Sequence, residues 1–322
     1  MTKDQITYIV FAIVLILALV FDLGLLSKKN QKVTIRQALY QTFFWVSLAL
    51  GFFVFMWIEK GETLALQYLS GYLMEWSLSI DNIFVFILIF SAFSVKEKHY
   101  GRVLLIGILM AIIFRVIFIT VGVALVNEFH WILYIFGVFL VYTGYKMFTA
   151  NDDEEFNPQD SKIYKWMKKF LPLAPHDGNG KYRIIENGRP VYTTLFVVII
   201  MLAAIDLVFA LDSIPAVMGI SQDKLVIYTS NIFAVLGLRS LFFLLRGAVT
   251  KFDYLQQGIA VVLVFIGIKM LAQDVINKWV PDKTIQVIIS LGVIVVCISG
   301  SIFYSIFINK KGEPPEVKDD SI

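Results

Sequence analysis

Two long apolar runs of this sequence each contain a pair of carboxylates. Glu75 and Asp81 are six residues apart in the first run, and Asp206 and Asp212 are six residues apart in the second. A charged side chain at the centre of a bilayer costs about 2.5–3.5 kcal/mol on insertion scales, so four such acids need either counter-charges or a function that uses them. Because carboxylate oxygens are preferred ligands of hard divalent cations, the acids predict a cation site or pathway.

Oxygen-bearing side chains accompany the acids. Ser79 and Asn82 flank the second acid of the first pair, and Ser213 directly follows the second acid of the other pair. Pro215 has no N–H, so the carbonyl of Leu211 loses its helical partner, and transporters coordinate ions at opened helices of this kind. The one cysteine and the three histidines lie away from the acids, which disfavours copper, zinc and haem.

A static ion-pair network is the alternative explanation of these acids. In such a network, basic residues neutralise the carboxylates without any transported ion. The two arginines inside apolar runs are expected to be structural partners of carboxylates, whereas the two lysines can also extend to the membrane interface. The candidate charge partners are Arg115, Arg239, Lys146 and Lys269.

The composition is that of a membrane protein. Of the 322 residues, 58% are hydrophobic and 16% are charged, and the mean hydropathy is +0.75. Soluble domains average about 45–50% apolar and about 25% charged residues, so a water-soluble fold is excluded. About 20 apolar residues cross a bilayer as a helix. This rule predicts nine spans, over residues 6–26, 38–58, 69–93, 103–126, 131–148, 194–220, 225–245, 255–271 and 285–308.

The basic residues set the predicted orientation. Nineteen of the 28 Lys and Arg residues fall in the loops after the odd-numbered spans and in the C-terminal tail, and five fall on the opposite side. The positive-inside rule therefore places the N-terminus outside and the C-terminus in the cytoplasm. These residues form no basic stripe with interleaved aromatic residues, so we expect no binding to nucleic acid.

An internal repeat relates the two acidic runs. Three segments match three others in order, at offsets of 131, 124 and 123 residues. Because each unit has three spans, the two units are inverted relative to each other, which is an architecture of transporters that work by alternating access. We expect the inversion to bring matching acids together, so that Asp81 and Asp212 share one site. The matching segments are 75–84 with 206–215, 107–115 with 231–239, and 144–147 with 267–270.

The repeat defines the predicted organisation of an all-α membrane protein. Residues 69–148 form the first unit and 194–271 the second, while 1–68 hold two peripheral spans and 272–322 hold the last span and the tail. Residues 149–193 form a large cytoplasmic loop. Within it, residues 163–171 alternate apolar and lysine positions like a helix lying on an anionic leaflet, and Asn187-Gly188 is typical of a hairpin turn.

The acidic segments carry a family resemblance. Residues 74–85, 206–217, 231–240 and 186–196 strongly resemble the TerC family of bacterial membrane proteins, particularly its longer Alx-like members. The resemblance implies a relative of LysE-type exporters, with manganese export as the activity of Alx-like members. It also implies that Glu75, Asp81, Asp206 and Asp212 handle the metal, with Asn82 and Ser213 beside them. The family is also named for tellurite resistance.

These observations favour a transporter over an enzyme. The expected activity is Mn²⁺ efflux through the bacterial inner membrane, with protons as the counter-ion, the lipid bilayer as surroundings and no tightly bound cofactor. No Gly-rich phosphate-binding loop occurs, which disfavours coupling to ATP. The alternative is a membrane scaffold or assembly partner whose buried charges are structural. The sequence does not fix the oligomeric state or exclude Mg²⁺, Ca²⁺ or Fe²⁺, because oxygen-only sites overlap in preference.

Overall fold

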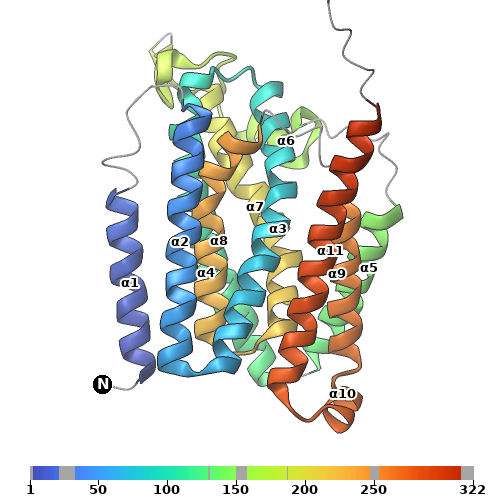
Figure 1. Ribbon diagram of the computed structural model, residues 1–322. Helices are drawn as coiled ribbons and strands as arrows, with labels where there is room; N and C mark the ends of the chain where they lie inside the picture. The colour runs from blue at the N-terminus through green and yellow to red at the C-terminus, as the bar shows by residue number, and fades with distance from the viewer. Residues whose placement is uncertain are drawn as a thin grey trace, which may run out of the picture.

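The fold is a bundle of long α-helices packed side by side, with a small hairpin at one end (Figure 1). The computed structural model describes residues 3–21, 33–129, 131–149, 158–186, 188–246 and 254–312. The longer helices are α1 (Lys3–Phe21), α2 (Ile35–Lys60), α3 (Glu62–Ala92), α4 (Glu97–Glu128), α5 (Ile132–Thr149), α7 (Thr194–Ile220), α8 (Lys224–Leu245), α9 (Leu255–Leu271) and α11 (Lys283–Gly312). The shorter elements are η2 (Pro158–Asp160), α6 (Lys162–Phe170), η3 (Gly178–Gly180), α10 (Gln273–Trp279) and the strands β1 (Arg183–Glu186) and β2 (Arg189–Tyr192).

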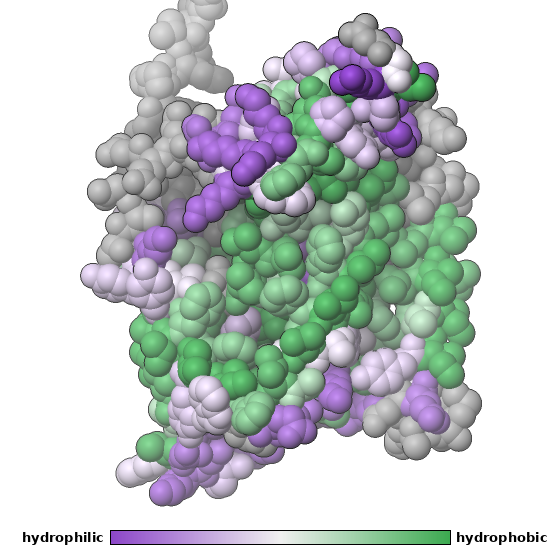
Figure 2. All heavy atoms as spheres, turned by 180° about the vertical axis from the view of Figure 1, so that it is seen from behind, coloured by the Kyte–Doolittle hydropathy of each residue, from purple (hydrophilic) through white to green (hydrophobic). Residues whose placement is uncertain are grey.

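The helices have the length and composition of a multi-pass membrane protein. Within the described residues, five helices are long and apolar enough to cross a bilayer, or six if the pair α9 and α10, bent by 78°, counts as one broken span. Helices α1 and α5 contain shorter apolar stretches. Each predicted span overlaps one of the longer helices, but the number that cross the bilayer stays a prediction. Figure 2 shows a hydrophobic band between two hydrophilic ends of the molecule.

Helices α3 and α7 pack together in opposite directions. Near the start of α3, Gln67 accepts a hydrogen bond of 2.6 Å from the hydroxyl of Ser221, which caps the end of α7. At the other end of the bundle, the segment that leads into α6 contacts both helices, through the Ala92 carbonyl of α3 and the sulfur of Met201 in α7. Residues that follow one another along α3 therefore run opposite to those along α7.

The helices of the two predicted repeat units pack in reciprocal pairs. Helix α3 packs on α8, and its counterpart α7 packs on α4, while α5 packs on α9. Helices α3 and α7 also contact each other, as do α4 and α8. Exchanging each helix for its counterpart in the other unit leaves all of these pairings unchanged. The packing is therefore the one expected for two copies related by a two-fold axis.

The crossing of α5 and α9 is a contact between backbones. A Cβ atom built on Gly144 would lie 2.7 Å from the carbonyl oxygen of Ala260, and one built on Gly267 would lie 2.7 Å from the carbonyl oxygen of Gly137. The repeat offset of 123 residues converts the first contact into the second. Small residues allow this close approach, as is usual at helix interfaces in membranes.

Helix α7 continues through Pro215 without interruption, so the expected opening of the helix is limited to the hydrogen bond that proline cannot donate.

Polar side chains cap several helix starts. Asp223 accepts a hydrogen bond of 3.1 Å from the backbone N–H of Val226 at the start of α8, and Thr34 and Gln37 form a capping box at the start of α2. Such caps satisfy backbone donors that a helix start would otherwise leave open.

The loop between α5 and α7 is anchored on the start of α4. The ammonium of Lys96 lies 2.8 Å from a carboxylate oxygen of Asp177, and the guanidinium of Arg102 stacks 4.5 Å from the ring centre of Tyr182. The hydrogen bond from Lys96 lowers the pKa of Asp177 below its usual value. Strands β1 and β2 pair antiparallel across Gly188, which has a φ of +74°, while Asn187 lies outside the described residues.

Helix α6 lies at the same end of the bundle as the hairpin and coincides with the predicted interfacial helix (Figure 1). Its Met167 is fully buried, whereas Trp166 and Phe170 are each 59% exposed. The ring of Tyr164 packs 5.2 Å from that of Phe93 at the end of α3. The apolar side chains of α6 thus divide between the bundle and its outer surface.

The backbone contact between α5 and α9 predicts that Gly144→Ala and Gly267→Ala each destabilise the protein. An added methyl group would meet a carbonyl oxygen, and overpacking of this kind costs about 1–3 kcal/mol. Thermal unfolding of the purified protein in one detergent measures the effect. Gly300→Ala in α11 is the control, because no atom lies within 4 Å of its added Cβ. Equal melting temperatures for all three variants would contradict the close approach.

Candidate functional site

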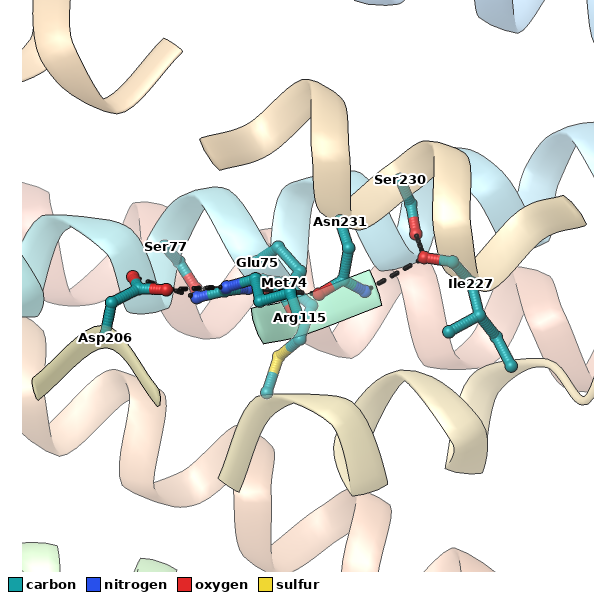
Figure 3. A network of polar contacts seen from close by, with 8 residues as sticks. All are labelled: Met74, Glu75, Ser77, Arg115, Asp206, Ile227, Ser230 and Asn231. Carbon is teal, nitrogen blue, oxygen red and sulfur yellow. Dashed lines mark hydrogen bonds and ion pairs between the residues drawn. The ribbon is translucent and has the colours of Figure 1, made fainter. Parts of the chain in front are cut away.

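A buried network of four side chains joins four helices (Figure 3). Arg115 of α4 donates through Nε to Asp206 Oδ2 of α7 at 2.9 Å and through Nη2 to Asp206 Oδ1 at 3.3 Å. Its Nη1 donates to Glu75 Oε2 of α3 at 2.5 Å and to Asn231 Oδ1 of α8 at 3.0 Å. One guanidinium therefore connects an acid from each predicted repeat unit.

The network lies at the middle depth of the bundle. Asp206 is twelve residues after the start of α7, which has 27 residues, and Glu75 is thirteen residues after the start of α3, which has 31. At 1.5 Å per residue these positions are about 18–20 Å along each helix. All four side chains belong to residues that are at most 1% exposed. The charges therefore have no access to water at either end of the bundle in this conformation.

The hydrogen bonds do not neutralise the acids completely. Asp206 uses both carboxylate oxygens, but Glu75 Oε1 is buried and has no hydrogen-bond partner in the described part of the chain. With both acids ionised, two carboxylates face one guanidinium, so one negative charge is in excess. A buried, unpartnered carboxylate oxygen beside an excess negative charge attracts a cation.

Further polar groups extend from the network along the two antiparallel helices. Ser79 and Asn82 are four and seven residues after Glu75, so all three lie on one face of α3. Ser213 is seven residues after Asp206 on one face of α7. These three residues are at most 3% exposed, and the hydroxyls of Ser79 and Ser213 have no hydrogen-bond partner among the described residues.

The remaining two acids lie on opposite sides of the network. The side chains of Asp81 and Asp212 are outside the described residues, but their backbones belong to α3 and α7. Each is six residues, or about 9 Å, beyond the acid that binds Arg115. Because α3 and α7 are antiparallel, these displacements have opposite directions. The expectation that Asp81 and Asp212 share one site does not fit this arrangement, whereas Glu75 and Asp206 do meet.

The candidate charge partners differ in their surroundings. Arg115 pairs with two acids, as described above. Arg239 is 5% exposed and lines a small cavity beside Trp45, and Lys269 donates a hydrogen bond of 2.9 Å to the hydroxyl of Ser290 rather than to a carboxylate. Lys146 lies in the last turn of α5, away from the network. Among the described residues, no three His, Cys, Asp or Glu side chains are close enough together to hold a metal.

Asn231 is a network residue that the sequence interpretation did not assign to the site. It is fully buried, and its amide nitrogen donates a hydrogen bond of 3.0 Å to the backbone carbonyl of Ile227. The signal in the sequence was an amide eight residues before Arg239 in an otherwise apolar run. The repeat aligns this position with Gly107, so the alignment itself gave no reason to expect a polar role.

These features define a polytopic α-helical membrane protein with a charged network at the middle of its bundle. The chain belongs to the TerC family, since the family described as "Integral membrane protein TerC family" matches residues 60–313.

Several relatives are similar over most of their length. An "Uncharacterized membrane protein STKORF319" of Myxococcus xanthus is 43% identical over 281 residues, covering 87% of this chain and 88% of the relative. A "Putative membrane-bound redox modulator Alx" of Escherichia coli (strain K12) is 40% identical over 293 residues, covering 88% of this chain and 89% of the relative. An "Uncharacterized membrane protein" of Rickettsia bellii is 40% identical over 264 residues, covering 82% and 87%. No solved structure matches the chain significantly.

The network predicts that Arg115→Met lowers stability strongly. The substitution leaves two buried carboxylates without their counter-charge, and breaking a buried ion pair in this way costs about 3–5 kcal/mol. The triple variant Arg115→Met, Glu75→Gln, Asp206→Asn removes the charges together and should recover most of the loss. Thermal unfolding in a single detergent compares the variants with the wild type. A single Arg115→Met variant as stable as the wild type would show that the acids do not depend on Arg115.

Proposed function

We propose that this protein transports a divalent cation, Mn²⁺, out of the cytoplasm. The observation that carries the proposal is the set of acids and unpartnered oxygens distributed along α3 and α7. Glu75 and Asp206 lie in the centre of the network, and the backbone positions of Asp81 and Asp212 lie on opposite sides of it. Acids at three successive levels offer an ion stepwise replacement of its water, which a purely structural ion pair does not require.

The proposed ligands of the metal all bind through oxygen atoms. Glu75, Asp81, Asp206 and Asp212 supply the carboxylates. Asn82 adds an amide oxygen next to Asp81, and Ser213 adds a hydroxyl oxygen next to Asp212. Ser79 adds a further hydroxyl between Asp81 and Glu75 along α3. Such a set suits Mn²⁺, Mg²⁺ and Ca²⁺ better than softer metals. The resemblance to Alx-like members favours Mn²⁺ among these.

Inverted repeats provide the mechanism of transport. We propose nine spans, with the N-terminus outside and the C-terminus in the cytoplasm, and two units over residues 69–148 and 194–271. The reciprocal pairing of α3 with α8 and of α7 with α4 supports this assignment. A crevice beside Asp206, between α3, α4 and α7, is too narrow for a water molecule. Rocking of the two units would then open the centre first to one side and then to the other.

The setting of the activity follows from the membrane fold. We place the protein in the bacterial inner membrane, with Mn²⁺ as substrate, protons as counter-ion and the bilayer as its surroundings. No catalytic reaction and no tightly bound cofactor are part of the proposal. The name of the Escherichia coli relative refers to redox modulation. This sequence has one cysteine, Cys297, so it offers no pair of thiols for dithiol chemistry.

A membrane scaffold is the second candidate, and one observation favours it. Arg115 already binds Glu75 and Asp206, so half of the acids have a structural partner. In a scaffold, the network would hold α3, α4, α7 and α8 together without any ion, and changes in the cytoplasmic loop rather than in the acids would abolish function. The transport assay below separates the two candidates.

The levels of acids predict that Asp81→Asn and Asp212→Asn each reduce Mn²⁺ efflux at least about tenfold, because consecutive steps of one pathway are all required. Because the times of consecutive steps add, the double variant should be only slightly slower than the slower single variant. Efflux is measured in proteoliposomes that contain monodisperse protein. Glu128→Gln, at an exposed position at the end of α4, is the control. Wild-type efflux in both single variants would favour the scaffold.

Proton coupling predicts that an inward proton gradient stimulates efflux. A carboxylate that alternates between a proton and the metal releases Mn²⁺ more readily on the acidic side. Vesicles with an imposed pH difference, and the same vesicles with an ionophore that collapses it, provide the comparison. Equal rates in the two conditions would remove proton coupling and leave the metal pathway in place.

A further inference from the structure

Arg115 occupies the oxygen atoms that a cation at the centre of the pathway would need. Both oxygens of Asp206 and one oxygen of Glu75 accept hydrogen bonds from its guanidinium. A metal ion that bound both acids would have to lie close to the position that the guanidinium holds. The guanidinium and the metal therefore compete for the same ligands.

The charge of the competing ion decides whether it can displace the guanidinium. A monovalent ion carries the same charge as Arg115, loses its own water, and gains no more Coulomb energy from the two acids than the guanidinium already has. A divalent ion gains twice the Coulomb energy at the same distance, against a larger cost of dehydration. Only a divalent ion therefore has a Coulomb advantage over the guanidinium with which to displace it.

Asn231 gives the guanidinium a partner outside the acids. Its Oδ1 accepts a hydrogen bond of 3.0 Å from the same Nη1 nitrogen that binds Glu75. The Asn231 amide nitrogen is fixed by the carbonyl of Ile227, one turn earlier in α8. Arg115 can therefore leave the acids and keep one hydrogen bond in a buried region, which lowers the cost of its displacement.

We propose that Arg115 is a tethered cation that sets the valence selectivity of the pathway, with Asn231 as the acceptor that holds the guanidinium while a divalent ion occupies Glu75 and Asp206. The proposal rests on the proposed function, because it assumes that a divalent ion reaches the centre. It makes Arg115 a specificity-determining residue rather than only a structural partner of the acids.

Mn²⁺ binding in the presence of K⁺ tests the proposal. The free aqueous Mn²⁺ signal in electron paramagnetic resonance falls when the ion binds purified protein, which gives the dissociation constant directly. The constant is measured in about 300 mM KCl and in N-methyl-D-glucamine chloride of equal ionic strength, so that general screening is the same in both. The large organic cation cannot enter a buried site, and the ratio of the two constants reports competition by K⁺ alone.

The wild type and Arg115→Gln should differ in that ratio. We expect a ratio below about twofold for the wild type and at least about tenfold for Arg115→Gln, because the open pair of acids then accepts K⁺. Arg115→Lys retains the charge without the bidentate contact and should stay closer to the wild type. Arg189→Gln, at an exposed position of strand β2, removes one positive charge elsewhere and should leave the ratio unchanged.

The double variant Arg115→Gln, Glu75→Gln guards against failure to fold. It keeps the single excess negative charge of the wild-type network, so it avoids two uncompensated acids, and its remaining carboxylate should also admit K⁺. A ratio near one in both Gln variants, with Mn²⁺ still bound, would overturn the role of Arg115 and leave the proposed function intact. Absence of Mn²⁺ binding to the wild type would overturn both.

Discussion

The bridge from one guanidinium to two carboxylates is the interaction on which the rest of this structure depends. Charges in the middle of an apolar bundle are tolerated only where they meet each other, and Arg115 is the point at which Glu75 and Asp206 meet. The contact requires that α3, α4 and α7 approach at one depth, and Asn231 adds α8 to the same point. The four central helices of the bundle are therefore held by polar contacts as well as by apolar packing.

Because α3 and α7 are antiparallel, the repeated pair of acids is distributed over three depths of the bundle. Two acids six residues apart would form one cluster if the helices were parallel and in register. Because the helices run in opposite directions, the first acids meet and the second acids diverge by about 9 Å on each side. The same sequence motif thus supplies both the central pair of acids bridged by Arg115 and the two flanking positions. The same geometry separates the hydroxyl of Ser213 on α7 from the hydroxyl of Ser79 on α3.

Part of this arrangement could be predicted from the sequence. The apolar runs predicted the longer helices, and the position of Arg115 inside an apolar run predicted its pairing with carboxylates, because an arginine in such a run has few other partners. The spacing of the acids did not predict that Asp81 and Asp212 are separated. In two inverted units only one pair of matching acids can lie next to the two-fold axis, and the sequence does not say whether it is Glu75 with Asp206 or Asp81 with Asp212. Asn231 was missed because its match in the repeat is Gly107. Helix α10 was missed because its seven residues have no apolar period long enough to detect.

The backbone contact between α5 and α9 has a mechanical consequence. Gly144 touches Ala260 at one point and Gly267 touches Gly137 at its counterpart, so the midpoint of the crossing is exchanged with itself when the two units trade places. In the proposed transport cycle, a rotation of the two units about this backbone contact would leave the contact in place. The crossing would then be the fulcrum, and displacement would grow with distance from it, toward the ends of the helices.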